Sequence, residues 1–210
     1  MMLNNVERRK YMKKKMILVA APPACGKTYV SELIAKSIDH IVYLDKDDLG
    51  DLIRAAFSVC GEKVNMDGDF YINNLRSAEY STMMDIAFSA LRFENIVLVN
   101  APFGKEVRDV EYMRQLKQRA NENGAQLFII WVTASAEVCY ERMKKRNSVR
   151  DVHKLNNWEN YVKKIDFTPP YELEENNAVD KVIIFDTNND EIIKKSLNET
   201  LKILKESNND

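Results

Sequence analysis

The chain has 210 residues, of which 45% are apolar and 30% are charged, and its formal net charge at pH 7 is −1. This length fits one domain of ordinary size, or one core with a small lid. The near-zero charge excludes an overall cationic field that would draw the protein to nucleic acid or to a membrane surface. Three widely separated cysteines form neither a disulfide framework nor a metal-ligand spacing, so a cytoplasmic location is expected.

The N-terminal residues 1–15 are rich in lysine and arginine and are expected to form a solvated basic leader. The apolar run that follows stops at Pro22 after about six residues, too short for a signal peptide or a membrane span. One domain is therefore expected to occupy residues 16–210.

Apolar runs alternate with amphipathic stretches along this domain. The runs are expected to be strands, at Met16–Ala21, His40–Leu44, Ile96–Asn100, Gln126–Thr133 and Lys181–Asp186. Because they are continuously apolar, they are typical of parallel strands covered on both faces. The stretches between them carry apolar residues at helical spacing. This alternation predicts an α/β fold, a three-layer sandwich around a parallel sheet. The long polar region at about residues 147–178 lacks a strand pattern and is the candidate for a mobile lid.

The turn after the first strand, Ala21–Thr28, reads APPACGKT. It ends like the phosphate-binding loop G-x-x-x-x-G-K-[ST] and lies between a strand and a helix, as that pattern requires. Ala21 stands where the first glycine is expected, but a residue before proline favours an extended backbone, so Ala21 can finish the strand. Because Pro22 and Pro23 have no N–H group, the phosphate cradle is expected to use backbone amides from Ala24 onward.

The residues of this loop match the needs of a bound nucleotide. Gly26 allows the backbone to approach closely, Lys27 would reach the β- and γ-phosphates, and the Thr28 hydroxyl would bind Mg²⁺. Cys25, beside a helix N-terminus and a lysine, either has a lowered pKa or is a small buried residue that fills the loop. The expected nucleotide contacts are Pro23, Ala24, Cys25, Gly26, Lys27, Thr28 and Tyr29.

Asp45, Asp47 and Asp48 follow the second strand, at the edge where parallel sheets bind ligands. A phosphotransferase needs a carboxylate that orients the acceptor hydroxyl, and oxygen ligands for Mg²⁺. Asp47 is the expected base, with Asp45 as the alternative base or as a ligand of metal-bound water. A solvated acidic turn that caps the next helix is the other interpretation, which Asp48 fits. Arg54, on that helix, either holds an anionic substrate or lies on the surface.

The third strand ends at Asn100, where a work-producing ATPase would carry an acid. An amide supplies no charge, although it can hold a metal-bound water or a substrate hydroxyl. The metal is therefore expected at Thr28 and Asp45. The acceptor pocket is expected at Asp45, Asp47, Arg54, Asn100 and Phe103.

Arg142, Arg146 and Arg150 are spaced four apart after the fourth strand. Such a row can clamp the charge of a transferring phosphoryl group when a lid closes. Arg146 and Arg150 are the expected catalytic arginines, and Arg146 is also expected to contact the nucleotide. Arg142 fits a solvated face that pairs with acidic residues.

The last strand ends in the sequence FDTNND. In this topology the loop lies beside the phosphate-binding loop. Thr187 and Asn188 could therefore contact the adenine base, or they could cap the final helix.

Together, APPACGKT, LDKDDL, VNAPF and RMKKRNSVRD resemble the P-loop kinase-like families grouped as AAA-family ATP-binding proteins of bacteria. Related groups are the zeta-toxin, chloramphenicol phosphotransferase, gluconate/shikimate kinase and polynucleotide kinase families. The resemblance implies a five-stranded parallel sheet in the order 2-3-1-4-5, the use of ATP and Mg²⁺, and transfer of the γ-phosphoryl group to a hydroxyl. It maps the base onto Asp47 and the lid arginines onto Arg146 and Arg150.

The leading hypothesis is an ATP-dependent kinase, monomeric or homodimeric, that acts on a small-molecule or nucleoside-type acceptor. A polynucleotide 5′-hydroxyl kinase is an alternative, for which Trp158, Tyr161 and nearby lysines would line the nucleic-acid channel. A nucleotide-gated binding or regulatory protein with little catalysis is another alternative. The sequence does not name the acceptor.

Overall fold

The computed structural model describes residues 13–148 and 151–206. Its strands form one parallel sheet in the order β2-β3-β1-β4-β5. The strands are β1 (Lys14–Ala20), β2 (Ile41–Asp45), β3 (Ile96–Asn100), β4 (Ala125–Thr133) and β5 (Lys181–Asp186). The predicted five-stranded parallel sheet and its strand order are confirmed.

Three strands differ at their ends from the apolar runs that predicted them, and of these β4 begins one residue early, at Ala125. β1 begins at Lys14 rather than Met16, because Lys14 and Lys15 continue the pairing with β4. The predicted leader therefore stops short of Lys14, and its residues 1–12 lie outside the described residues. β2 begins at Ile41 because His40 has a φ of 59°, a left-handed turn conformation that a strand does not accept.

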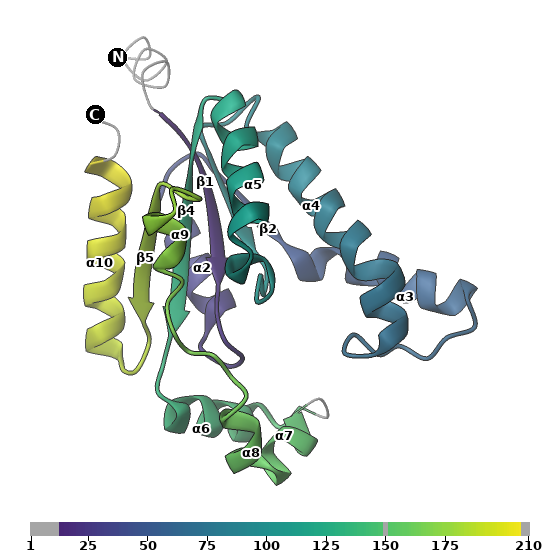
Figure 1. Cartoon of the computed structure of the whole chain (residues 1–210). Coiled ribbons are helices and arrows are strands. Elements are labelled where there is room, and N and C mark those ends of the chain that lie inside the picture. The colour runs from purple at the N-terminus through teal and green to yellow at the C-terminus, as the bar shows by residue number, and fades with distance from the viewer. Residues whose placement is uncertain (1–12, 149–150, 207–210) are drawn as a thin grey trace.

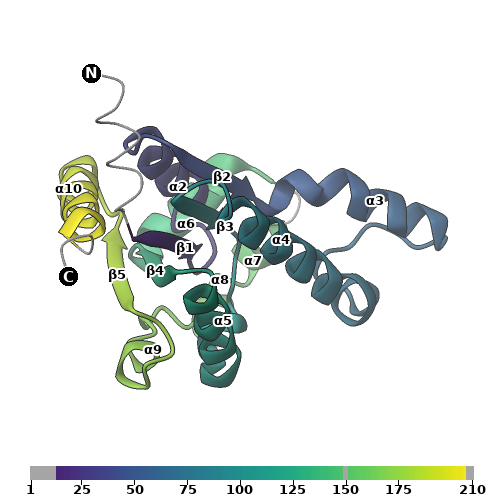
Figure 2. The ribbon, with the colours of Figure 1, turned by 90° about the horizontal axis from the view of Figure 1, so that it is seen from above.

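Helices cover both faces of the sheet, as Figure 2 shows. One face packs against α2 (Lys27–Lys36), α6 (Ala136–Arg146) and α10 (Asp190–Glu206). The other packs against α4 (Arg76–Ala90), α5 (Val110–Glu122) and α9 (Glu172–Glu175). Alternate residues of each strand point to opposite faces, so Ile17 and Val19 join the first core while Met16 and Leu18 join the second. The predicted three-layer sandwich is confirmed.

An arm extends from the sheet after β2. It consists of α3 (Gly50–Val59), the π-helical turn η2 (Tyr71–Leu75) and the adjoining part of α4, and it projects to one side in Figure 1. A short 3₁₀ turn, η1 (Lys46–Leu49), joins β2 to the arm. Ile53, Phe57 and Tyr71 give the arm a small core of its own.

The predicted lid region divides into two parts. α7 (Val152–Asn156) and α8 (Trp158–Val162) follow α6 near the carboxyl ends of the strands (Figure 1). In contrast, Leu173 and Ala178 are fully buried in the main core. The C-terminal part of the expected lid, residues 147–178, is therefore packed against the sheet, and closure of residues 147–167 stays a prediction.

Within the described ranges, the helices lack either the length or the apolar character that a membrane crossing needs.

Candidate functional site

The loop between β1 and α2 has the backbone of a phosphate-binding turn. Gly26 precedes α2 with a φ of 88°, a conformation that glycine adopts without steric cost. Ala24 has a φ of 65°, which costs an alanine about 1 kcal/mol. The amide of Cys25 donates to Pro22 O at 3.4 Å, closing the turn. The expected strand, loop and helix are therefore present, and the loop places Lys27 and Thr28 in the first turn of α2.

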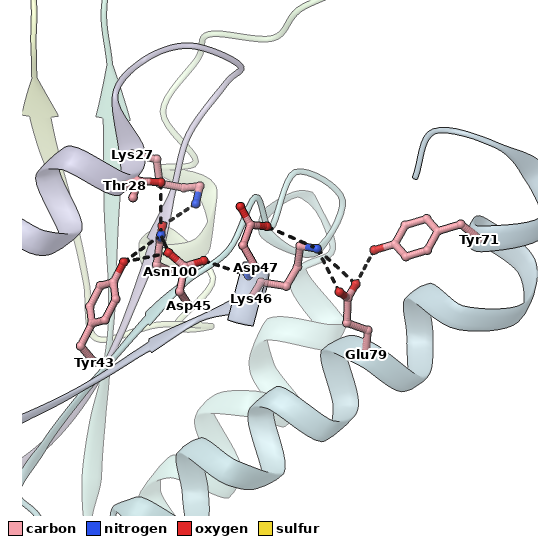
Figure 3. A network of polar contacts seen from close by, with 9 residues as sticks. All are labelled: Lys27, Thr28, Tyr43, Asp45, Lys46, Asp47, Tyr71, Glu79 and Asn100. Carbon is pink, nitrogen blue, oxygen red and sulfur yellow. Dashed lines mark hydrogen bonds and ion pairs between the residues drawn. The ribbon is translucent and has the colours of Figure 1, made fainter. Parts of the chain in front are cut away.

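Asn100 is the centre of a polar network at this edge of the sheet (Figure 3). It is fully buried, and its Oδ1 accepts a hydrogen bond from Lys27 Nζ. Its Nδ2 donates to Asp45 Oδ2 and lies 3.4 Å from Thr28 Oγ1. The register explains the contact with Asp45, because Asp45 lies opposite Asn100 in the β2–β3 pairing. One amide thus joins the lysine, the hydroxyl and the carboxylate.

The buried side chain of Lys27 has a lowered pKa. Burial lowers its pKa from 10.5 to about 8, while the charges of Asp45 and Asp47 oppose that shift. The ammonium of Lys27 is bonded to Asn100, which is neutral, rather than to a carboxylate. An arriving phosphate would therefore not have to break an ion pair of Lys27 with the third strand.

The structure gives Asp45 and Asp47 different surroundings. Both oxygens of Asp45 are engaged, since Oδ1 accepts from the Asp47 amide at 2.9 Å and Oδ2 accepts from Tyr43 Oη at 2.8 Å. The Asp47 side chain is 84% exposed. Asp47 therefore offers an exposed carboxylate, whose Oδ1 lies 4.0 Å from Lys46 Nζ, while Asp45 is held beside Thr28 and Asn100.

The donor set near Thr28 fits Mg²⁺. The Thr28 hydroxyl and the Asp45 carboxylate are hard oxygen ligands, and both contact the same Asn100 amide. The described residues contain no group of three or more His, Cys, Asp or Glu side chains suited to a metal. A phosphate-bound Mg²⁺ usually needs just one or two protein ligands, with the rest from phosphate and water.

Arg142 was expected on a solvated face, and the structure corrects this. Its guanidinium donates to Thr187 Oγ1 at 2.9 Å and to Thr187 O at 2.6 Å, and it reaches Ala24 O at 3.5 Å. Arg142 therefore borders the phosphate-binding loop. Its place in the arginine row was the available signal, but the row alone could not show which member packs against that loop.

Thr187 and Asn188 are structural members of the site. Thr187 is 1% exposed, and its hydroxyl donates to Cys25 O at 2.8 Å. Asn188 Oδ1 accepts from the Ser135 amide at 2.7 Å. The expected direct contact of Thr187 with a nucleotide is therefore replaced by support of the loop, because burial leaves its side chain little free surface.

The contacts of Arg142 with Thr187, and of Thr187 with Cys25 O, form a clasp beside the phosphate-binding loop. A cavity of about 460 Å³ lies next to this clasp, between α6 and the loop after β5. Its size falls within the range of small-molecule sites. Its lining is mostly charged and polar, and its apolar residues are Val138 and Ile193. The lining residues include Val138, Glu141, Arg142, Asn188 and Ile193.

Of the other predicted arginines, the two that the structure describes pair with carboxylates. Arg146 forms an ion pair with Asp151, with Nη2 at 2.7 Å and Nε at 2.9 Å from Oδ2. Arg150 lies outside the described residues. Arg54 is an exposed residue of α3 that pairs with Asp51 at 2.6 Å. These positions leave their expected roles as proposals.

Phe103 does not line an acceptor pocket in this structure. Its φ is 49°, and its side chain is fully buried against Tyr80 in an edge contact with ring centroids 5.7 Å apart. The sequence could not show this turn, which directs the ring into the core. Tyr29, by contrast, is 56% exposed on the first turn of α2, where a nucleotide contact remains open to it.

Cys25 follows the second of its two expected interpretations. It is 1% exposed, and its Sγ lies 3.5 Å from Cys139 Sγ. The hydrogen bond with Cys139, together with burial, raises the pKa of the Cys25 thiol. The thiol is therefore a buried packing group of the loop.

The aromatic residues considered for a nucleic-acid channel pack against one another. Trp158 contacts Tyr140 and Tyr161, with ring centroids 5.1 and 5.8 Å apart. Trp158 also packs against the core. Rings that pack against each other offer less face to bases, and this observation does not favour the polynucleotide alternative.

Comparison with known proteins places this chain in a family. The model of a family described as AAA domain matches residues 16–166, and the chain belongs to that family. A search of the curated proteins found no significant match.

The solved structures share the fold. A candidate kinase from Chloroflexus aurantiacus is 17% identical with a TM-score of 0.60, over 93% of this chain and 98% of that one. Shikimate kinase from Bacteroides thetaiotaomicron is 12% identical with a TM-score of 0.52, over 91% and 98%. Shikimate kinase from Acinetobacter baumannii, in complex with shikimate, is 13% identical with a TM-score of 0.50, over 94% and 97%.

Proposed function

We propose that the protein is an ATP-dependent phosphotransferase that moves the γ-phosphoryl group of ATP to a hydroxyl of a small-molecule or nucleoside-type acceptor. The observation that carries the proposal is the placement of Lys27, in the first turn of α2, and the exposed Asp47, just after β2, which are joined through Asn100 and Asp45. The family match and the shared fold of two shikimate kinases support it.

Each side chain has a task in this reaction. Lys27 would neutralise the phosphates, and Asp47 would align the acceptor hydroxyl in line with the γ-phosphorus and take its proton. The hydroxyl oxygen forms the new bond to phosphorus as the bond to ADP breaks. Arg146 and Arg150 would stabilise the transferring group once residues 147–167 close over it.

In this proposal the base of the nucleotide and the Mg²⁺ ion have separate sites beside the loop. The cavity beside Arg142 would take the base, because it adjoins the clasp that holds the loop. Thr28, and Asp45 through water, would hold Mg²⁺, which supplies positive charge at the phosphates when it is bound.

An acceptor screen tests the proposal. The protein is incubated with Mg·ATP labelled in the γ-phosphate and with pools of sugars, amino alcohols and nucleosides, and labelled products are identified by mass. Transfer that Lys27→Ala abolishes is the expected result. ATP binding without transfer to any pool would instead indicate a nucleotide-gated binding protein.

A further inference from the structure

Lys46 lies between Asp45 and Asp47 in the chain, yet its side chain turns away from the phosphate-binding loop toward the arm (Figure 3). Its ammonium donates to both carboxylate oxygens of Glu79 in α4, at 3.1 and 3.2 Å. The side chain of Glu79 is 1% exposed and that of Lys46 is 13% exposed. This ion pair is therefore shielded from solvent.

Tyr71 completes the contact from the arm. Its hydroxyl donates to Glu79 Oε2. Burial, together with the hydrogen bond to Glu79, raises the pKa of Tyr71, so that the hydroxyl keeps its proton and stays a donor. The buried carboxylate is thus fully satisfied, and the segments η1, η2 and α4 meet at it.

The geometry of this contact matters more than its net contribution to stability. A buried ion pair gains little overall, because the cost of desolvating both charges nearly cancels their attraction. Lys46 directly precedes Asp47, and its Nζ lies 4.0 Å from Asp47 Oδ1. On the other side, the Asp47 amide is bound to Asp45 Oδ1. Contacts with the arm on one side and with the sheet on the other therefore fix the turn that carries Asp47.

We infer that Lys46 and Glu79, supported by Tyr71, are positioning residues of the phosphotransferase. They fix the turn that carries Asp47 and hold the arm against the carboxyl edge of the sheet, so that an acceptor hydroxyl meets Asp47 and the γ-phosphorus in line. The catalytic meaning of this inference rests on the proposed function, whereas the coupling between arm and turn does not.

Hydrogen exchange without nucleotide measures that coupling. Lys46→Met should speed exchange of the η1 amides about tenfold or more, together with amides of η2, because both lose their common anchor. Lys46→Arg, which can still pair with Glu79, should restore much of the protection. Unchanged exchange in Lys46→Met would overturn the inference.

The double variant Lys46→Met/Glu79→Gln separates positioning from simple stabilisation. Lys46→Met alone should lower the unfolding midpoint, and removing both charges should return the midpoint close to that of the original protein. In the double variant, ADP formation from Mg·ATP, with water as the probe acceptor, should be about 10- to 100-fold slower than in the original protein, with the Kd of Mg·ATP unchanged. Recovery of ADP formation along with the midpoint would show a structural role and contradict positioning.

Lys117→Met is the matched control. Lys117, which is 11% exposed, pairs with the 24% exposed Asp180 at 3.2 Å, before the start of β5 and so at the opposite edge of the sheet. This variant should lower the unfolding midpoint without changing ADP formation or exchange in η1. If the original protein does not bind Mg·ATP, that result would contradict the proposed function rather than the inference. Where hydrolysis is below detection, the exchange measurement alone decides the inference.

Discussion

Lys27 sets the upper pH limit of the proposed nucleotide site. Burial lowers its pKa from 10.5 to about 8, with Asp45 and Asp47 opposing the shift. Above that pH the free protein loses the ammonium that a phosphate needs. The folded state also binds fewer protons than the unfolded state between about pH 8 and 10.5, so this group's destabilising effect is largest below pH 8 and is relieved as the pH rises.

Affinity for ATP should therefore fall as the pH rises through about 8, by up to about tenfold per pH unit. Titration calorimetry between about pH 7 and 9.5 measures this dependence. Lys27→Arg, which keeps its charge throughout, should bind with little dependence on pH. An equally steep dependence in Lys27→Arg would assign the titration to another group.

Cys25 shows how a residue-scale expectation can reverse. Its pKa is raised by the hydrogen bond with Cys139 and by burial, although its position in the sequence allowed the opposite. A maleimide should therefore label the exposed Cys60 much faster than Cys25 or Cys139. Peptide mass mapping measures the three rates, and Cys60→Ser removes the fast phase as a control. Labelling of Cys25 at the rate of Cys60 would contradict the packed loop.

At the scale of elements, α6 and the loop after β5 clasp the phosphate-binding loop. Arg142 bonds to Thr187, and Thr187 bonds in turn to Cys25 O. Arg142→Met should weaken ATP binding about tenfold and lower the free energy of unfolding by about 1–3 kcal/mol, because buried acceptors lose their donor. Lys144→Met, on an exposed position of the same helix, should change neither quantity. Unaltered ATP affinity in Arg142→Met would show that the clasp is not needed.

The elements themselves were largely predictable, and their mutual packing was not. Continuous apolar runs predicted each strand, because strands covered on both faces leave little room for polar residues. The strand ends in the structure differ from the predicted ends where strand pairing extends beyond the apolar run, as at Lys14, or where a left-handed turn shortens it, as at His40. Arg142 and Phe103 were misplaced because tertiary contacts and a turn with positive φ decide their surroundings.

At the scale of the whole molecule, the parallel topology brings the candidate site together. The order β2-β3-β1-β4-β5 places the carboxyl ends of β1 and β2 on either side of β3. Lys27, Asp45 and Asn100, distant in sequence, therefore meet at one edge. The sequence predicted Lys27 from the phosphate-binding loop pattern, and Asp45 and Asn100 from their positions at strand ends. It could not predict the tie between Lys46 and Glu79, which depends on how the arm folds back.

The central claim is that Lys27 holds the phosphates while Asp47 aligns an acceptor hydroxyl. The most direct test measures transfer of label from γ-labelled ATP to the screened acceptor pools by the original protein and by Asp47→Asn. The Kd of Mg·ATP is measured for both proteins alongside. Asp47→Asn should lose transfer by about 100-fold or more while its Kd stays within about threefold. Full transfer by Asp47→Asn would contradict the assigned base, and binding without transfer in the original protein would contradict the kinase.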